Sequence, residues 1–282
     1  MVVRSVVAYT LGGMSLLSGD IVGASRAFVE ASEAGRSAGN IHVAVPALSN
    51  LAELQVVQGQ LRQAAETCRQ ALELAIGQHG QPLAVAASAY SEMGSLLYEW
   101  NDLEAAAHRV TKAFELSEQW GNVDMLVGNC VTLARVLHAQ GDVDGALKAL
   151  QRADQLIRGR ATAPPVAARV AAHRAWLWLQ QGDIAAASRW AQESRIGPSL
   201  ALRASPGDGL GYMGEFERIT LARVLIAQGE FVEALARLAQ LLEAAETQTV
   251  STVKSHVNHI HGKLGVKSRT QAVAQARALG LL

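Results

Sequence analysis

Apolar residues along most of this chain recur every three to four positions, which is the spacing of one buried face on an α-helix. The clearest helical stretches are residues 61–75, 103–116, 143–157 and 231–245. No run of Val, Ile or aromatic residues alternates with polar residues in the way that a half-buried strand does. The pattern predicts an all-α protein.

A short turn signal separates these helices at regular intervals. A Gly or Asn followed by an acidic or polar residue recurs after 40, 42, 40, 41 and 47 residues. Residues 132–141 and 220–229, which lie 88 positions apart, are identical at nine of ten positions. Self-similarity at such a period is typical of stacked helical pairs. We therefore predict an α-solenoid of about six helical pairs over residues 1–246, with turns at Gly19-Asp20, Gly59-Gln60, Asn101-Asp102, Gly141-Asp142, Gly182-Asp183 and Gly229-Glu230.

Composition agrees with a helical protein that has a continuous core. Half of the 282 residues are hydrophobic. Two cysteines, Cys68 and Cys130, lack the spacing of a metal site or a redox pair, so we interpret both as core thiols in a reducing cytoplasm. The apolar residues 4–17 resemble a signal peptide, but the turn at Gly19-Asp20 favours the first repeat helix. No segment is long and apolar enough to predict a membrane span. The breaker-rich residues 196–211 are expected to form a loop.

The last 36 residues, 247–282, differ from the rest of the chain in charge. The whole chain is formally neutral, yet this tail has no Asp or Glu and contains five Lys or Arg residues, so residues 1–246 carry a net charge of minus five. The tail also reads as two short capped helices. A basic terminal module on an acidic body is typical of a protein that contacts phosphate backbones. A solvated helical hairpin is the alternative interpretation.

The string TVKSHVNHIHGKLGVKSRTQAV from Thr252 to Val273 resembles the recognition helix and the last helix of the LuxR-type helix-turn-helix, a module of bacterial transcription regulators. The scaffold and positioning helices that precede the recognition helix in that family are absent here. The resemblance implies that Lys254, Ser255 and Asn258 face base edges in the major groove, with Ser251, Thr252, Lys267 and Arg269 nearer to phosphates. It also implies a homodimer contact through residues Thr270–Leu279.

The solenoid resembles a known family as well. Its helical pairs, and above all EFERITLARVLIAQGEFVEAL from Glu215 to Leu235, are similar to the tetratricopeptide-like domain of large ATP-dependent LuxR-type activators, the maltose-regulator-like class. In that class the solenoid senses an inducer or an inhibitory protein. No Gly-x-x-x-x-Gly-Lys-Ser/Thr phosphate loop is present, so no ATP or other cofactor is expected. We expect an internally deleted or fragment-like member, which lacks the ATPase and the front half of the helix-turn-helix.

Other chemistry is weakly indicated. His256, His259 and His261 lack the carboxylate or thiol that would complete a metal site, so no metal is expected. Glu215 and Glu217 lie near Asp208, but carboxylates on repeat helices are usually solvated, and an enzyme is not expected. The chain has five tryptophans, Trp100, Trp120, Trp176, Trp178 and Trp190. They either line an effector groove or pack between helices.

Two functions remain. In the first, the chain is a DNA-binding transcription regulator whose solenoid senses a small effector or a protein partner. In the second, it is an interaction scaffold that does not bind DNA, and the tail is a vestige that caps the solenoid. The acid-free tail favours the first function, and the missing helices favour the second.

Overall fold

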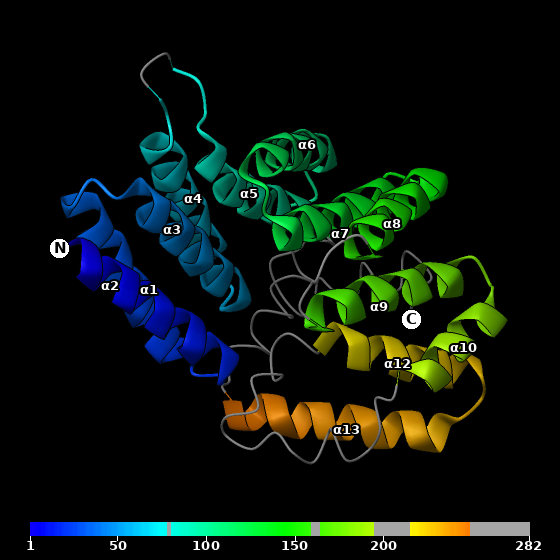
Figure 1. Ribbon diagram of the computed structural model, residues 1–282. Helices are drawn as coiled ribbons and strands as arrows, with labels where there is room; N and C mark the ends of the chain where they lie inside the picture. Colours follow the sequence, from blue (N-terminus) through cyan, green and yellow to red (C-terminus); the bar gives the residue numbers. More distant parts are fainter. Residues whose placement is uncertain (78–79, 159–163, 195–214, 249–282) are drawn as a thin grey trace.

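The computed structural model describes residues 1–77, 80–158, 164–194 and 215–248, and these residues are almost entirely helical (Figure 1). They contain no strand, and the only bridge among them joins Ile76 to Pro82. This agrees with the all-α prediction. The helices are α1 (Val2–Leu17), α2 (Ile21–Ser37), α3 (Ile41–Val57), α4 (Leu61–Leu74), η1 (Ala84–Ala86), α5 (Ala87–Glu99), α6 (Leu103–Trp120), α7 (Val123–Ala139), α8 (Val143–Arg158), α9 (Pro164–Gln180), α10 (Ile184–Glu193), α12 (Glu215–Ala227) and α13 (Phe231–Gln248).

Every turn that the sequence predicts joins the two helices of one pair. The Gly or Asn of each turn has a positive φ, between 62° at Asn101 and 87° at Gly141. Glycine adopts this left-handed conformation without strain, so it ends the first helix. At four of the turns the next residue is an Asp whose carboxylate accepts a hydrogen bond from the backbone N–H three residues on, for example Gly23 N–H to Asp20 Oδ1 at 2.8 Å. The Gly-Asp signal is therefore a helix stop followed by a helix start.

The helical pairs follow one another along a curve, from α1 and α2 in blue to α12 and α13 in yellow and orange (Figure 1). The first helices of neighbouring pairs contact one another in the series α1, α3, α5, α7, α9 and α12. Each second helix packs against the first helix of the next pair, as α2 does on α3 and α6 does on α7. The first helices thus form one continuous layer, which we call the inner layer.

Small side chains allow the helices to approach closely. Fully buried alanines recur on the packed faces of the second helices, among them Ala24, Ala64, Ala106 and Ala146. Gly94 on α5 faces Val110 on α6 so closely that an added Cβ would lie 2.5 Å from Val110 Cγ2. Larger residues such as Phe28, Leu54 and Leu150 fill the space between pairs. The core therefore consists of clusters that are distributed along the stack, rather than of one central cluster.

Both cysteines are free and buried, as the sequence predicts. Burial raises the pKa of the Cys130 thiol to about 11, and burial together with Glu92 raises the pKa of Cys68 further. Neither thiol is therefore ionised near neutral pH. In the ranges that the structure covers, no helix is long and apolar enough to cross a membrane.

One connection differs from the short turns that the sequence predicts. Between α4 and α5 the chain makes the Ile76–Pro82 bridge and the short 3-10 helix η1 before the next helix begins at Ala87. Leu83 N–H donates to Ala75 O at 2.8 Å, which closes this excursion onto the end of α4. The spacing between successive Gly or Asn turns stays close to 40 residues despite this excursion, because α5 has only 13 residues. The predicted loop at residues 196–211 and the predicted tail helices lie outside the described residues.

Candidate functional site

The residues that the sequence assigns to DNA contact lie outside the part of the chain that the structure describes. These are Ser251, Thr252, Lys254, Ser255, Asn258, Lys267 and Arg269. The three tail histidines, Asp208 and the side chain of Glu215 lie outside it too. Their roles stay predictions. The described residues offer a different candidate site, on the inner layer.

Four charged side chains of the inner layer influence one another electrostatically. Glu53 on α3, Glu92 on α5, Arg169 on α9 and Glu217 on α12 belong to four different helical pairs, and we call them the inner charged cluster. Arg169 acts electrostatically on all three carboxylates. Packed helix axes lie about 8–10 Å apart, so a straight inner layer would separate α3 from α9 by roughly 25–30 Å. The electrostatic contact between Arg169 and Glu53 therefore requires that the inner layer lie on the concave side of the curve.

A glycine on α7 gives Arg169 room to reach the other carboxylates. A Cβ added at Gly128 would lie 3.8 Å from Nη2 of Arg169, so the guanidinium rests directly against this helix. A long side chain at position 128 would occupy the same space.

The cluster has more negative than positive charge. Three carboxylates face one guanidinium, a formal charge of −2 when all four groups are ionised. Glu53, Glu92 and Arg169 are half-buried, and Glu217 is only 6% exposed. No direct ion pair joins Arg169 to these carboxylates within the described ranges. The four groups therefore interact over distances longer than that of a direct ion pair.

Burial decides how these carboxylates titrate. Desolvation raises the pKa of Glu53, and Arg169 lowers it by a smaller amount. The pKa of Glu92 is raised well above its usual range by desolvation and by the nearby charge of Glu53. Desolvation raises the pKa of Glu217 as well, against the opposing effects of its own backbone N–H, Arg169 and Arg218. All three carboxylates thus lack the cationic partners that would fully stabilise their ionised forms.

Glu217 corrects one expectation from the sequence. A carboxylate on a repeat helix is usually solvated, but Glu217 is buried where α12 packs on α9. Its Oε2 and the Oγ1 of Thr220, one turn further along the same face, have no hydrogen-bond partner among the described residues. Thr220 is fully buried. Unsatisfied buried polar atoms are rare in folded proteins, and each needs an explanation such as a bound water or ion.

Ion pairs and rings fix the surroundings of the cluster. Arg135 on α7 pairs with Glu99 at 3.1 Å and lies 4.3 Å above the ring centroid of Tyr98. His173 on α9 is 5% exposed, and burial together with the guanidinium groups of Arg135 and Arg169 lowers its pKa to about 3. His173 is therefore neutral across the physiological range.

The tryptophans of this region mainly pack between helices. Trp176 lies between His138, at a centroid distance of 4.5 Å, and Phe216, at 6.4 Å. Trp178 packs in the core and carries Arg174 at 5.4 Å above its ring, while Arg174 also pairs with Asp154. Trp190 and Trp120 belong to core clusters, and Trp100 is 45% exposed at a turn. Four of the five tryptophan side chains therefore pack between helices and do not line an aromatic effector groove.

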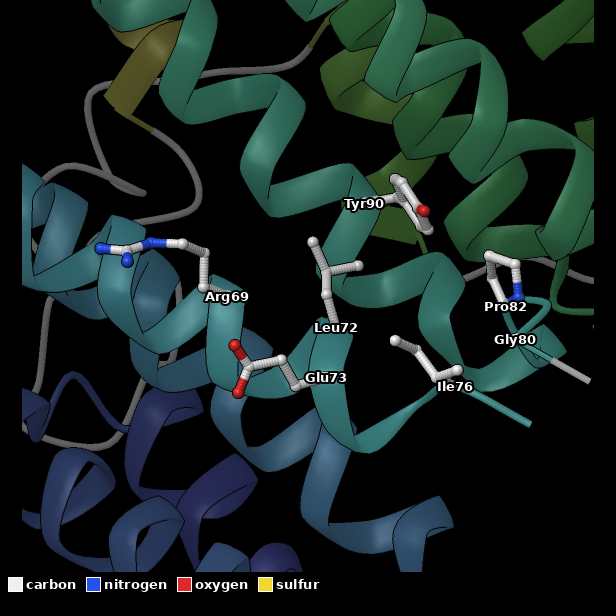
Figure 2. Close-up of a pocket in the computed structure, with 7 residues that line it drawn as sticks. All are labelled: Arg69, Leu72, Glu73, Ile76, Gly80, Pro82 and Tyr90. Carbon is white, nitrogen blue, oxygen red and sulfur yellow. The ribbon is translucent and has the colours of Figure 1, made fainter. Parts of the chain in front are cut away.

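A pocket of about 260 Å³ lies away from the cluster, at the excursion between α4 and α5 (Figure 2). Leu72, Ile76 and Pro82 give it apolar walls, and Arg69 already pairs with Glu66 at 2.5 Å. The volume is below the usual range of about 300–1,000 Å³ for ligand pockets. Among the residues that the structure covers, no group of His, Cys, Asp and Glu side chains is arranged to hold a metal ion.

The inner charged cluster was missed in the sequence because its successive members are 39, 77 and 48 positions apart. A usable signal does exist. Glu53 is the only Asp, Glu, Lys or Arg in the stretch ALSNLAELQVV of α3, and Arg169 is the only one in the stretch PPVAARVAAH of α9. A charge inside an apolar first helix has either a buried partner or a ligand.

Comparison with known proteins identifies the solenoid. The family described as the MalT-like TPR region matches residues 1–258. The HTH-type transcriptional regulator MalT of Serratia proteamaculans is 27% identical over 247 residues, which cover 82% of this chain and 25% of that protein. MalT of Yersinia enterocolitica is 29% identical over 205 residues, which cover 72% of this chain and 22% of that protein. The chain thus spans about a quarter of the length of these curated relatives.

Solved structures share the fold. A crystal structure of a Rap protein complexed with Competence and Sporulation Factor aligns with a TM-score of 0.60, at 13% identity, over 96% of this chain and 76% of that chain. BtubC (BKLC) from P. vanneervenii aligns with a TM-score of 0.53, at 22% identity, over 81% of this chain and 90% of that chain. These likenesses support a tetratricopeptide-like helical repeat. Since the family match covers most of its length, this chain belongs to the MalT-like TPR region family.

Proposed function

We propose that this chain is the sensing part of a transcription regulator. Its inner layer receives an effector at the inner charged cluster, and its basic C-terminal residues contact DNA. The observation that carries the proposal is the cluster itself, in which one guanidinium interacts with under-neutralised carboxylates from three other helical pairs, and in which the buried Glu217 Oε2 and Thr220 Oγ1 have no hydrogen-bond partner among the described residues. The similarity to MalT regulators supports the regulatory role.

The cluster is suited to sensing because it couples distant pairs. A ligand that contacts Glu53 and Glu217 bridges the second pair to the sixth, so it binds one curvature of the solenoid better than another. A ligand shifts a conformational equilibrium only by such differential binding. The curvature of the solenoid is therefore the property that an effector changes.

The DNA-contacting role rests on the tail. Lys254, Ser255 and Asn258 are proposed to reach base edges, and Ser251, Thr252, Lys267 and Arg269 to reach phosphates. Lysine donates to the guanine acceptors, and asparagine pairs with adenine through two hydrogen bonds. A homodimer through residues 270–279 would double the number of phosphate contacts and present two half-sites.

The experiment is fluorescence anisotropy of labelled duplex DNA, random and genomically selected, titrated with the full chain across a salt series. The matched variant replaces Lys254, Lys263 and Lys267 with Glu. We expect salt-sensitive binding that the variant loses, because each lost phosphate contact lowers the salt slope by about one. Equal affinities of the two proteins, or no binding at low salt, would exclude the tail as a DNA-contacting element.

An interaction scaffold is the second candidate, and the first helix favours it. Val3, Val7, Leu11 and Met14 form an apolar stripe along α1, and each is more than 45% exposed. Exposed apolar stripes of this kind mark protein interaction surfaces. The titration separates the two candidates, because a scaffold does not bind DNA. A scaffold would also tolerate the Lys→Glu variant and lose partner capture when Val7 and Leu11 are replaced by Ser.

A further inference from the structure

The first helix exposes apolar positions that are buried in every other helical pair. Met14 lies five residues before the turn of its pair and is 63% exposed, whereas its counterparts at the same distance from the other turns are at most 1% exposed. Val7, twelve residues before the turn, is also exposed although its counterparts are buried. The counterparts are Leu54, Leu96, Val136, Leu177 and Val224 for Met14, and Ala47, Ala89, Asn129, Val170 and Glu217 for Val7.

The last described helix exposes the opposite half of the same repeat. Leu238 on α13 lies nine residues after the turn of its pair and is 36% exposed. Its counterparts in the first four pairs are at most 1% exposed, and they are Phe28, Cys68, Val110 and Leu150. Phe231 and Leu235, which share a helix face with Leu238, are exposed as well.

Within the chain these two sets of positions pack on one another. Phe28 of α2 belongs to one core cluster with Ala47 and Leu54 of α3, the first helix of the next pair. The same positions recur in the cluster that contains Leu150 of α8 with Val170 and Leu177 of α9. The residue nine positions after a turn therefore packs with the residues twelve and five positions before the next turn. The exposed faces of α13 and α1 are the two halves of this interface.

We propose that the solenoid associates head to tail with a second copy of the chain, the α13 face of one copy packing on the α1 face of the next. Leu238 of one copy then packs with Val7 and Met14 of the next, in continuity with the interface between neighbouring pairs. A helical-repeat protein that ends its stack usually has a polar outer face on its terminal repeat. Neither described face is polar. The proposal goes beyond the proposed function, because it uses neither the inner charged cluster nor the tail.

The charges near the two faces permit this contact. Arg4 is the only Asp, Glu, Lys or Arg of α1, and it pairs with Glu30 of α2 at 2.8 Å. On the first half of α13, Glu233 and Arg237 pair with each other at 2.6 Å. Burial of the apolar faces is therefore not opposed by an unpaired charge of these helices. Since the two faces differ, each copy has one of each, and association gives open chains or closed rings.

The test measures mass by sedimentation velocity of the full chain at loading concentrations up to about 100 μM, which detects dissociation constants of that size. One variant, Val7→Glu/Met14→Glu, blocks the α1 face. A second variant, Leu235→Glu/Leu238→Glu, blocks the α13 face. All four positions are exposed, so the changes leave the fold intact, and thermal unfolding checks this.

The chain offers a matched control in Val22→Glu/Val29→Glu. Both valines are exposed on α2. Their counterparts in the next three pairs are polar or charged, namely Arg62, Glu104 and Asp144 for Val22, and Arg69, Thr111 and Gln151 for Val29. The control therefore adds the same charges at positions that the interface between pairs does not use.

We expect the wild type and the control to form oligomers whose mass rises with concentration. Each blocked variant alone should stay monomeric or associate at least about tenfold more weakly, because a glutamate would be buried without a partner. An equimolar mixture of the two variants should form a dimer and nothing larger, since each keeps one intact face. A monomeric wild type, which would mean that another occupant covers these faces, would overturn the proposal.

Two other results would also overturn it. Oligomers of the α13 variant alone would indicate a symmetric contact between two α1 faces, and a mixture of the variants that stays monomeric would exclude the pairing of α1 with α13. DNA titration of the two variants reports on the proposed function separately. Loss of self-association with unchanged DNA binding supports both proposals, whereas self-association without DNA binding supports this contact and excludes the DNA-contacting role.

Discussion

The imidazole of His173 stacks on the ring of Phe216 with a centroid distance of 3.8 Å and an angle of 13° between the ring planes. His173 Nδ1 also lies 2.9 Å from the backbone oxygen of Arg169, one turn earlier on α9. This arrangement joins α9 to α12 next to the inner charged cluster. Because the ring is buried near Arg135 and Arg169, a second proton on it would be unfavourable.

Acid should destabilise the protein through His173. The pKa of His173 is about 3 in the folded chain, whereas an unfolded histidine titrates near 6.5. Between these values the unfolded chain binds more protons, so the free energy of unfolding falls as the pH falls from about 6.5 toward 3. His173→Gln should reduce the pH dependence of the free energy of unfolding in this range by up to about 1.4 kcal/mol per pH unit. Urea unfolding at several pH values measures it, with the exposed His108→Gln as control. An unchanged slope would contradict the burial of a neutral ring.

Arg169→Met should destabilise the chain more at neutral than at acidic pH. Arg169 lowers the pKa of Glu53, Glu92 and Glu217, so its loss raises their pKa values further above those of the unfolded chain. Stability is then lost as the pH rises through those values. We expect a loss of about 1–3 kcal/mol at pH 7 and less near pH 4.5. Chemical denaturation measures both, and the exposed Arg62→Met serves as the control. Equal losses at the two pH values would argue against the cluster.

Adjacent glycines in α1 should respond oppositely to alanine. A Cβ added at Gly12 would lie 2.6 Å from Cε1 of the buried Phe28, whereas nothing lies within 4 Å of one added at Gly13. Gly13→Ala should stabilise the chain by about 0.5–1 kcal/mol, since alanine favours the helix. Gly12→Ala should destabilise it by about 1–3 kcal/mol, because the core is overpacked. Thermal unfolding compares them, and equal shifts would show that α1 is not packed on α2 in this way.

Lys254→Ala tests the proposed recognition role of the tail. If Lys254 contacts a base, the variant should lose about 1–3 kcal/mol of binding to its selected site and little binding to random DNA. If it contacts a phosphate, both affinities fall together. Anisotropy titrations with both duplexes distinguish the cases, and the exposed Lys148→Ala on α8 is the control. Unchanged affinity for both duplexes would remove Lys254 from the interface.

Local chemistry explains why the repeat was predictable. The stop at Gly141 and the start at Asp142 depend on a positive φ and on one carboxylate that caps the next helix, and both act within about four residues. The apolar spacing of each helix is equally local. The excursion between α4 and α5 was not predicted because it closes through the Leu83 and Ala75 backbone and the Ile76–Pro82 bridge, which leave no side-chain pattern.

The sequence by itself determined the helices, their pairing, the turns and the charge contrast between body and tail, because each depends on neighbours along the chain. Only the tertiary structure decided that Glu53, Glu92 and Glu217 lie within the electrostatic influence of Arg169 and that Glu217 is buried. The physical reason is curvature. A small rotation from each helical pair to the next accumulates along the stack and brings together residues more than 100 positions apart.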